Sequence, residues 1–270
     1  MTIEEAHDIL FDDLNIFDRI CQENNIRYYL SGGSAIGAVR EKDFIAWDDD
    51  VDIDICGEDY PRFKQIMQEK LPDYLELIEP QDFSPYFYDF VIRIVDKRWL
   101  LHEEKTEDVA YKNYQNRIGI DVFLCCKFPK DIFGQKLFII MLQILYGMCM
   151  AYRYKIDFSK YSLIEKMEVA FLRTIGRIYS GKNPKRIIQR WFQFIQCYER
   201  KETGMRYTVN TLFKKMYMIS MPERWFGKPM YGYIRGKAFP IFTNYDEVLR
   251  KIYGDYMTPE RNSEKYITHV

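Results

Sequence analysis

Acidic and β-branched residues alternate between Asp48 and Ile55, where the sequence reads DDDVDIDI. This alternation predicts a β-strand, because successive side chains of a strand point to opposite faces. Asp50, Asp52 and Asp54 should therefore share one face. Like charges this close repel unless a cation neutralises them, and Mg²⁺ or Mn²⁺ prefers carboxylate oxygens. Because residues two apart lie about 6.6 Å from one another, Asp50 and Asp52 can share one ion, whereas Asp54, about 13 Å from Asp50, is expected not to join them.

Two other interpretations of this acidic stretch were weighed. A calcium loop of the EF-hand type needs Gly at its sixth position and Glu at its twelfth. Neither a register that starts at Asp48 nor one that starts at Asp50 places these residues there, which excludes the loop. A solvated acidic edge strand remains as the alternative to a metal site.

A second carboxylate stands out in the apolar segment 118–124, which reads IGIDVFL and is predicted to be a strand. Asp121 is flanked there by apolar residues, and an unpaired carboxylate is costly to bury. The alternative is that Asp121 lies at a strand end and caps a turn.

A small-residue turn precedes the acidic stretch. Ser31-Gly32-Gly33-Ser34 follows the short apolar run 28–30, predicted to be a strand, and opens a helical segment predicted over Ala35–Arg40. A glycine turn at a helix N-terminus presents backbone N–H groups that can hold a phosphate. The alternative is a plain tight turn. A phosphate-binding turn followed closely by paired carboxylates is more specific than either feature alone.

These motifs together resemble a known family. The strings Leu30-Ser-Gly-Gly-Ser34, Gly37-Ala-Val-Arg40 and Trp47-Asp-Asp-Asp-Val-Asp-Ile53 are similar to those of the LicD-type phosphocholine transferases and their fukutin-related relatives, within the nucleotidyltransferase-fold superfamily. That family typically has His where this chain has Glu41 and Pro where it has Ala46. Residues 239–257 also resemble the C-terminal signature of the family, and Pro259, Arg261 and His269 match its final positions loosely.

The resemblance implies a site and a reaction. Asp50, Asp52 and Asp121 are expected to hold Mg²⁺ or Mn²⁺, with Asp121 or the metal activating the acceptor hydroxyl. The residues expected at the donor phosphates are Gly32, Gly33, Ser34, Arg40 and Arg93. For Arg93 the alternative is a structural salt bridge to an acidic residue. The implied reaction moves phosphocholine or a polyol phosphate from a CDP-alcohol donor to a sugar hydroxyl of a glycan or glycolipid precursor, as in lipopolysaccharide, teichoic acid or capsule.

Two rival functions stay open at this point. The first is a nucleotidyltransferase that acts on a small molecule and releases diphosphate rather than CMP. The second is an inactive nucleotidyltransferase-like scaffold that binds a partner, which the intact Asp50, Asp52 and Asp121 disfavour. For the transferred group the resemblance favours choline, which aromatic faces would bind by cation–π contact. The rings near the predicted site in sequence are Trp47, Tyr86, Phe87, Tyr88, Tyr231 and Tyr233.

Composition limits the classes of protein. The chain has 270 residues, 47% of them hydrophobic, and a net charge of −1, which argues against a nucleic-acid-binding protein. Six cysteines without paired metal spacing, and no secretory signal, favour free thiols in a reducing, cytoplasmic compartment. We expect one elaborated α/β (α+β) domain over 1–270, with a nucleotidyltransferase-type mixed sheet flanked by helices.

Hydrophobic periodicity places the other elements. Residues 3–23 should form an amphipathic helix that begins with a capping box at Thr2 and Glu5. Further helices are expected at 58–71 and 244–253, and strands at 75–78, 90–95 and in short pieces over 206–242.

Residues 131–203 are expected to form a helical insertion with an apolar run at 137–151 and helices at about 162–179 and 185–199. Basic residues are scattered through this segment. The preferred interpretation is that its helices pack in the core, and the alternative is that they form a surface that contacts the inner face of a membrane.

Overall fold

The structure is a computed structural model that describes residues 1–209 and 220–259. Its strands are β1 (Tyr29–Leu30), β2 (Val51–Cys56), β3 (Leu75–Ile78), β4 (Ile92–Leu100), β5 (Arg117–Lys127), β6 (Met205–Val209), β7 (Ser220–Pro222), β8 (Met230–Ile234) and β9 (Lys237–Ile241). Its helices are α1 (Ile3–Glu23), α2 (Gly32–Ile36), α3 (Tyr60–Lys70), α4 (Thr106–Ala110), α5 (Ile132–Cys149), α6 (Leu163–Ser180), α7 (Lys185–Glu199) and α8 (Tyr245–Tyr253).

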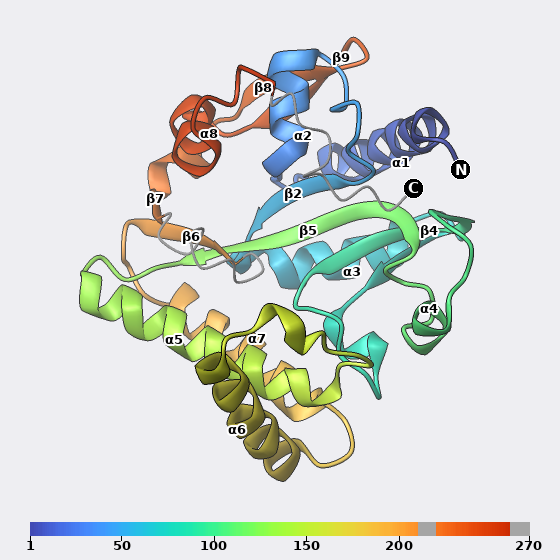
Figure 1. Cartoon of the computed structure of the whole chain (residues 1–270). Helices are drawn as coiled ribbons and strands as arrows, with labels where there is room; N and C mark the ends of the chain where they lie inside the picture. Colours follow the sequence, from blue (N-terminus) through green and yellow to red (C-terminus); the bar gives the residue numbers. More distant parts are fainter. Residues whose placement is uncertain (210–219, 260–270) are drawn as a thin grey trace.

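All nine described strands join one mixed sheet. The main path runs β3-β4-β5-β2-β1-β9-β8, while β6 pairs with β5 and β7 pairs with β6. β2 and β5 are parallel, and β4 is antiparallel to β5. Figure 1 shows α5, α6 and α7 gathered at one end of the molecule, away from α2, α8 and the β8–β9 hairpin. The mixed sheet flanked by helices confirms the predicted fold class.

Helix α1 forms where the sequence pattern predicted it. Thr2 Oγ1 accepts a hydrogen bond from the Glu5 N–H, and the Glu5 carboxylate accepts one from the Thr2 N–H, which confirms the capping box. The apolar stripe of α1, which includes Leu10, Leu14 and Phe17, is fully buried. Each such side chain stabilises the fold by about 1.5–3 kcal/mol.

One face of the central strand β2 is buried in the core. Val51, Ile53 and Ile55 of β2 are fully buried in the main core, as the alternation predicted. The opposite face of β2 carries Asp52 and Asp54. The strand begins at Val51 rather than at the predicted Asp48, so Asp50 precedes it directly. This shift leaves the predicted face for the carboxylates unchanged.

Helices α5, α6 and α7 follow β5, at the positions predicted for the insertion. α5 begins at Ile132, five residues before the predicted apolar run, because the Asp131 side chain caps it by accepting from the Gly134 N–H. α7 belongs to the main core, since its buried Trp191 stacks on Phe90 with ring centroids 4.5 Å apart.

Arg206 of β6 ties these helices to the sheet. Its guanidinium lies 3.3 Å from a carboxylate oxygen of Glu199, 2.9 Å from one of Glu58 and 3.2 Å from one of Glu223. Arg206 is 1% exposed and the Glu199 side chain is buried with it, whereas the side chains of Glu58 and Glu223 are partly exposed to solvent.

Several predicted boundaries differ from the observed ones. The predicted strand at 90–95 begins at Ile92 and runs on to Leu100. The helical segment predicted from Ala35 begins earlier, at Gly32 within the glycine turn, as the short helix α2, and a π-helical turn over Gly37–Glu41 follows it. Short strands over 206–242 are present as β6 to β9, although 210–219 lie outside the described residues. Arg261 and His269 lie outside them as well.

Candidate active site

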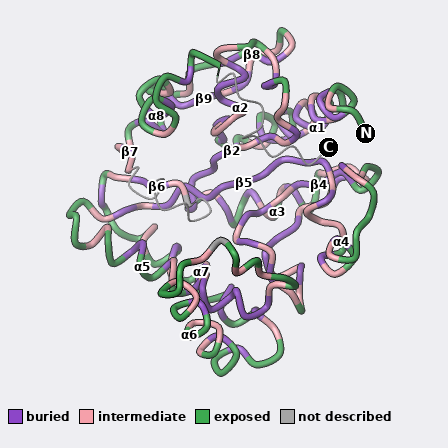
Figure 2. The backbone as a smooth tube through the Cα atoms, viewed as in Figure 1, coloured by how far each residue is buried: buried purple, intermediate pink, exposed green. Residues whose placement is uncertain are grey.

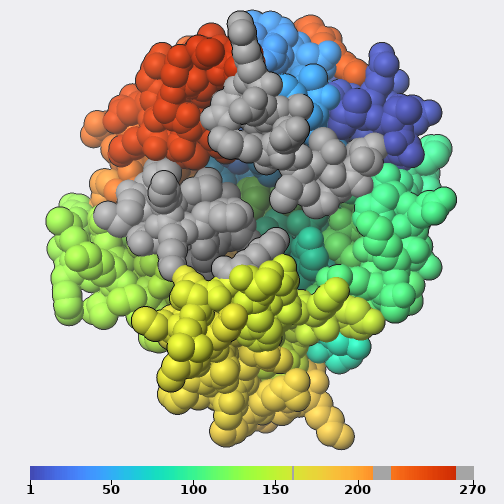
Figure 3. All heavy atoms as spheres, in the orientation of Figure 1, coloured from blue at the N-terminus to red at the C-terminus, as the bar shows by residue number. Residues whose placement is uncertain are grey.

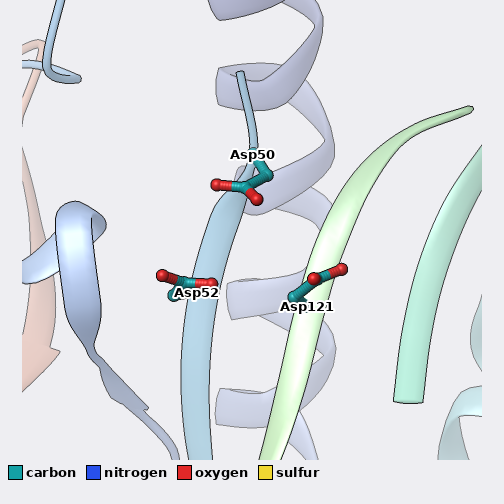
Figure 4. Close-up of side chains that lie close together, drawn as sticks. All are labelled: Asp50, Asp52 and Asp121. Carbon is teal, nitrogen blue, oxygen red and sulfur yellow. The ribbon is translucent and has the colours of Figure 1, made fainter. Parts of the chain in front are cut away.

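Asp52 and Asp121 lie side by side on the parallel strands β2 and β5, where they are partners in register. Asp50 directly precedes β2, and one carboxylate oxygen from each of the three residues lies within 4.8 Å of the others. Figure 4 shows the three side chains gathered over β2 and β5. The three predicted ligands are therefore brought together. The alternative that Asp121 caps a turn at a strand end is wrong, because Asp121 lies within β5.

The glycine turn packs directly against two carboxylates. A Cβ atom on Gly32 would lie 2.2 Å from Asp52 Oδ2, and one on Gly33 would lie 2.1 Å from Asp48 Oδ2. Gly32 also has φ +53°, a conformation that favours glycine. The Ser34 hydroxyl accepts a hydrogen bond of 2.9 Å from the Asp52 N–H. The turn thus positions the acidic cluster, whereas its contact with donor phosphates stays a prediction.

Burial of so many carboxyl groups perturbs their ionisation. Desolvation, followed by the charges of Asp50 and Asp121, raises the pKa of Asp52 well above its ordinary value. Desolvation also raises the pKa of Asp121 to about 7, although Arg93 opposes this rise. The pKa of Asp48 is raised to about 8 by desolvation and then by the charges of Asp50 and Asp49. A cation placed among these groups would lower all of these pKa values.

The donor set fits a hard divalent cation. Asp50, Asp52 and Asp121 offer carboxylate oxygens, which Mg²⁺ and Mn²⁺ prefer, and they lie within one small volume. The ion pair between Asp121 and Arg93 balances one of the three negative charges. The site therefore suits a metal ion, and which ion it holds stays a prediction.

Arg93 completes a row of charged residues across three strands. It is the partner of Asp121 in register between β4 and β5, and its guanidinium lies 3.1 Å from the Asp121 carboxylate and 3.7 Å from that of Asp89. The structural salt bridge weighed for Arg93 is thus present. Arg93 also lines a polar pocket with Asp50, Tyr88 and Arg117, and its role at the donor phosphates stays a prediction.

Arg40 is placed differently from the prediction. Its guanidinium donates to the Glu41 carboxylate and to the backbone carbonyl of Tyr256. Among the described residues, Arg40 lines neither of the two pockets beside the acidic cluster. Its predicted position near the donor phosphates therefore has no support in this arrangement.

A second pocket, largely apolar, opens beside Asp52 on the side of α8. Its polar members are Ser31, Gly32, Asp52, Asp54 and Thr208, and its rings are Phe123, Tyr207, Phe242, Tyr245 and Tyr253. We call it the ring pocket. It lies on the same side of the sheet as the acidic cluster, because Asp52 and Asp54 alternate with the buried face of β2 and Phe123 is in register with Asp54.

Asp54 is the buried acid of the ring pocket. Its side chain accepts a hydrogen bond of 3.2 Å from the Thr208 hydroxyl at Oδ2, while Oδ1 has no hydrogen-bond partner among the described residues. Asp54 is 2% exposed, and desolvation raises its pKa to about 8. Reasoning from the sequence predicted only that Asp54 would stay apart from the metal ion, and it missed the pocket.

The rings proposed from sequence proximity mostly lie elsewhere. Phe87 is fully buried, Trp47 packs against the main core, and Tyr231 and Tyr233 are exposed on β8. Tyr86 packs in a cluster of tyrosines near α4. Tyr88 alone lies near the acidic cluster, in the polar pocket beside Arg93. The rings of the ring pocket come instead from β5, β6 and the segment 242–253.

Comparison with known proteins supports the resemblance seen in the motifs. Residues 25–125 match the family described as LicD/FKTN/FKRP, nucleotidyltransferase domain, a span that contains the glycine turn and all three clustered carboxylates. The chain is similar to the lipopolysaccharide cholinephosphotransferase LicD of Haemophilus influenzae, with 24% identity over 280 residues, which cover 98% of this chain and 96% of that protein.

Two shorter similarities fall on uncharacterized proteins. One, from Rickettsia typhi, is 33% identical over 96 residues, which cover 35% of this chain and 29% of that protein. The other, from Rickettsia prowazekii, is 43% identical over 111 residues, which cover 41% of this chain and 36% of that protein. The predicted resemblance to the LicD family is confirmed by these comparisons.

Proposed function

We propose, from the LicD-type nucleotidyltransferase domain at residues 25–125, that this chain transfers a phospho-alcohol group to a sugar hydroxyl. The donor would be a CDP-alcohol, with phosphocholine or a polyol phosphate as the group transferred. The acceptor would be a glycan or glycolipid precursor of the cell surface. The H. influenzae relative, a lipopolysaccharide cholinephosphotransferase by name, supports this choice because it aligns with 98% of the chain.

The proposed reaction is a displacement at phosphorus. The oxygen of the acceptor hydroxyl forms a new bond to the phosphorus that carries the alcohol, the bond between that phosphorus and the bridging oxygen of the diphosphate breaks, and CMP leaves with that oxygen. The hydroxyl proton passes to Asp121 or to solvent. A divalent cation held by Asp50, Asp52 and Asp121 would neutralise charge on the diphosphate.

The observation that carries the proposal is the register of Asp52 with Asp121, beside Asp50. The remaining contribution of the chain is positioning. Gly32 and Gly33 let the turn approach the carboxylates closely, and Ser34 fixes the start of β2 through the Asp52 N–H. Such positioning of reacting groups supplies much of the rate enhancement in phosphoryl transfer.

The test is CMP release. Purified protein is incubated with CDP-choline or CDP-ribitol, Mg²⁺ or Mn²⁺, and envelope glycolipid or simple hexosides as acceptors, and CMP is measured by chromatography. We expect CMP to appear, to disappear with EDTA, and to be lost in Asp52→Asn while the circular dichroism spectrum and the melting temperature show an intact fold. Asp73→Asn, the same substitution at an exposed position outside the acidic cluster and its pockets, serves as the control.

The rival functions give different products. A nucleotidyltransferase acting on a small molecule would consume CTP and release diphosphate. A scaffold would bind without any turnover. Full turnover in Asp52→Asn would contradict the proposal even if CMP is the product.

The ring pocket favours a cationic head group over a polyol. A quaternary ammonium has no hydrogen-bond donor, and it binds to aromatic faces and to a carboxylate, each good ring contact contributing about 0.5–2 kcal/mol. The ring pocket offers five rings and the buried carboxyl group of Asp54. A polyol would instead need several hydroxyl, amide or carboxylate partners. We therefore propose that CDP-choline is the preferred of the two donors.

Competition between the two donors tests this preference. We expect CDP-choline to be used in preference to CDP-ribitol. Asp54→Asn should raise the apparent KM for CDP-choline by about 10- to 100-fold, because a bound cation would lower the raised pKa of Asp54 and ionise it, whereas the amide cannot ionise. Asp73→Asn, the same substitution at an exposed position that lines neither pocket, is the control. Turnover of the polyol donor alone would show that the ring pocket does not select the head group.

A further inference from the structure

Helices α5 and α6 expose an unusual number of large apolar side chains. On α5 the exposed residues are Ile132, Phe133, Leu137, Ile140, Met141 and Ile144, and on α6 they are Leu163, Ile164, Met167, Phe171 and Ile178. Four of them, Phe133, Leu163, Ile164 and Ile178, are between 70% and 81% exposed. We call these eleven residues the apolar helix surface. Monomeric proteins rarely leave apolar patches of this extent uncovered.

The apolar helix surface points outward from both helices. α6 packs on α5 through close contacts at two glycines, Gly147 of α5 against Leu172, and Gly176 of α6 against Met148. At 100° per residue, Gly176 lies nearly opposite the stripe formed by Leu163, Met167 and Phe171, so that stripe faces away from α5. Figure 2 shows α6 as largely exposed or intermediate, and Figure 3 shows residues of α5 and α6 in the lower part of the visible surface.

One face of α5 packs in the core of this fold. By length and composition, the segment Ile132–Tyr152 is the one helix among the described residues that is long and apolar enough to cross a membrane. However, 39% of its apolar window is buried in the protein, and Phe138, Leu142 and Cys149 belong to the main core. Only the opposite face of α5 is therefore available for contact with a membrane or a partner. This arrangement is typical of a helix that lies along an interface.

The charge of the same segment indicates what the surface meets. Residues 131–203 contain thirteen Lys and Arg against six Asp and Glu, although the whole chain has a net charge of −1. The rest of the chain is therefore acidic, and positive charge is concentrated where the apolar helix surface lies. Lys136 on α5, Lys155, and Lys182 and Lys185 after α6 are exposed. Apolar side chains among exposed cations suit the surface of an anionic bilayer.

We propose that the apolar helix surface docks on an anionic lipid bilayer, with the side chains of α5 and α6 at the boundary between head groups and acyl chains. The protein would then be peripheral, held at the inner face of the membrane by apolar contact and by charge. This inference does not depend on the proposed reaction. It is compatible with a glycolipid acceptor, which such docking would bring to the same face of a bilayer.

Vesicle flotation tests the proposal with the full chain. Vesicles of phosphatidylcholine alone are compared with vesicles that contain 30% phosphatidylglycerol, at low and at high NaCl. We expect the protein to float with the anionic vesicles, to bind at least about tenfold less to neutral ones, and to be partly released by salt. Protein that stays at the bottom of the gradient with every composition would overturn the proposal.

Matched variants distinguish binding through the apolar helix surface from nonspecific binding through any exposed apolar residue. The triple variant Phe133→Ser, Leu163→Ser, Phe171→Ser should lose at least about tenfold in binding to anionic vesicles and keep its circular dichroism spectrum and melting temperature. The control, Trp99→Ser, Val109→Ser, Tyr231→Ser, removes exposed apolar residues outside α5 and α6 and should bind like the unmodified protein. Equal loss in both variants would contradict the proposal. A dimer in light scattering that the first variant abolishes, without vesicle binding, would assign the surface to a second copy instead.

Discussion

Replacing Arg93 by Met tests how the charge row across the sheet is balanced. In the folded protein the guanidinium faces two carboxylates, 3.1 Å from Asp121 and 3.7 Å from Asp89. The side chains of all three residues are at most 16% exposed. Arg93→Met places an uncharged, unbranched side chain of similar length at this position. It leaves both carboxylates in a buried environment without their cation.

The expected cost follows from this geometry. Removing one partner of a buried ion pair destabilises a protein by about 3–5 kcal/mol, because the remaining charge is left uncompensated. For a domain of this size that corresponds to a fall in melting temperature on the order of 10 °C. The loss should be smaller at pH 5 than at pH 8. The pKa of Asp121 is already raised to about 7, and without Arg93 this carboxyl group takes up a proton more readily as the pH falls.

Urea unfolding and thermal melts at the two pH values, with and without Mg²⁺, measure the effect. At pH 8, Mg²⁺ should restore part of the stability of Arg93→Met, since a cation at Asp50, Asp52 and Asp121 replaces some of the lost positive charge. The double variant Arg93→Met, Asp121→Asn should lose less than the sum of the single variants. A fall in melting temperature below about 2 °C at pH 8 would refute the reasoning, and would leave Arg93 free to serve the donor phosphates alone.

Three further predictions concern other parts of the molecule. Gly32→Ala should lower turnover by about 100-fold in steady-state kinetics, because its Cβ would lie 2.2 Å from Asp52 Oδ2 and displace one of the three clustered carboxylates. Asp13→Asn should stabilise the protein at pH 8 but not at pH 5 in urea unfolding. Burial raises the pKa of Asp13 to about 7, so the native state binds more protons than the unfolded chain and loses stability as the pH rises from about 4 through 7. Arg206→Met should cost about 3–5 kcal/mol in the same assay, since Glu199 and its other acidic partners would lose a buried cation.

Short-range patterns in the sequence predicted much of the fold and of the acidic cluster. The capping box of α1 and the alternation around Asp52 depend on neighbours in the chain, so they can be recognised locally. That Asp121 joins Asp52 could be inferred only from the family resemblance, since strand register between distant segments leaves no local signal. For Arg93, the sequence left a salt bridge and a phosphate contact open, and only the pairing of β4 with β5 places it against Asp121.

The ring pocket shows where such reasoning fails. Proximity in sequence selected Trp47 and Phe87, which the fold uses as core residues. The rings that do line the pocket, such as Tyr207 and Tyr253, come from segments that follow the helical insertion, far along the chain from Asp54. Nothing in their local sequence distinguishes them from the many other aromatic residues of the chain. Three-dimensional proximity alone identifies them.

The way in which α5, α6 and α7 are attached to the sheet determines which of these helices can be replaced. The chain leaves the sheet at Lys127 of β5 and re-enters it at Met205 of β6, and Lys127 is the direct partner in register of the next residue, Arg206. The three helices thus connect two strands that already pair with each other in the sheet. Replacing a short turn there by a loop of about 80 residues costs only about 2–3 kcal/mol in closure entropy.

A long insertion between β5 and β6 therefore costs little stability, in evolution and in protein engineering alike. α6 lies farthest from the sheet, so the part of the excursion around it is the natural unit to shorten, exchange or fuse. α7 is not exchangeable in the same way, because Trp191 completes the core and Glu199 pairs with Arg206. A chimera that keeps α5 and α7, whose side chains join the core, and borrows only α6 from a relative would change the exposed surface of this excursion while the acidic cluster stays in place.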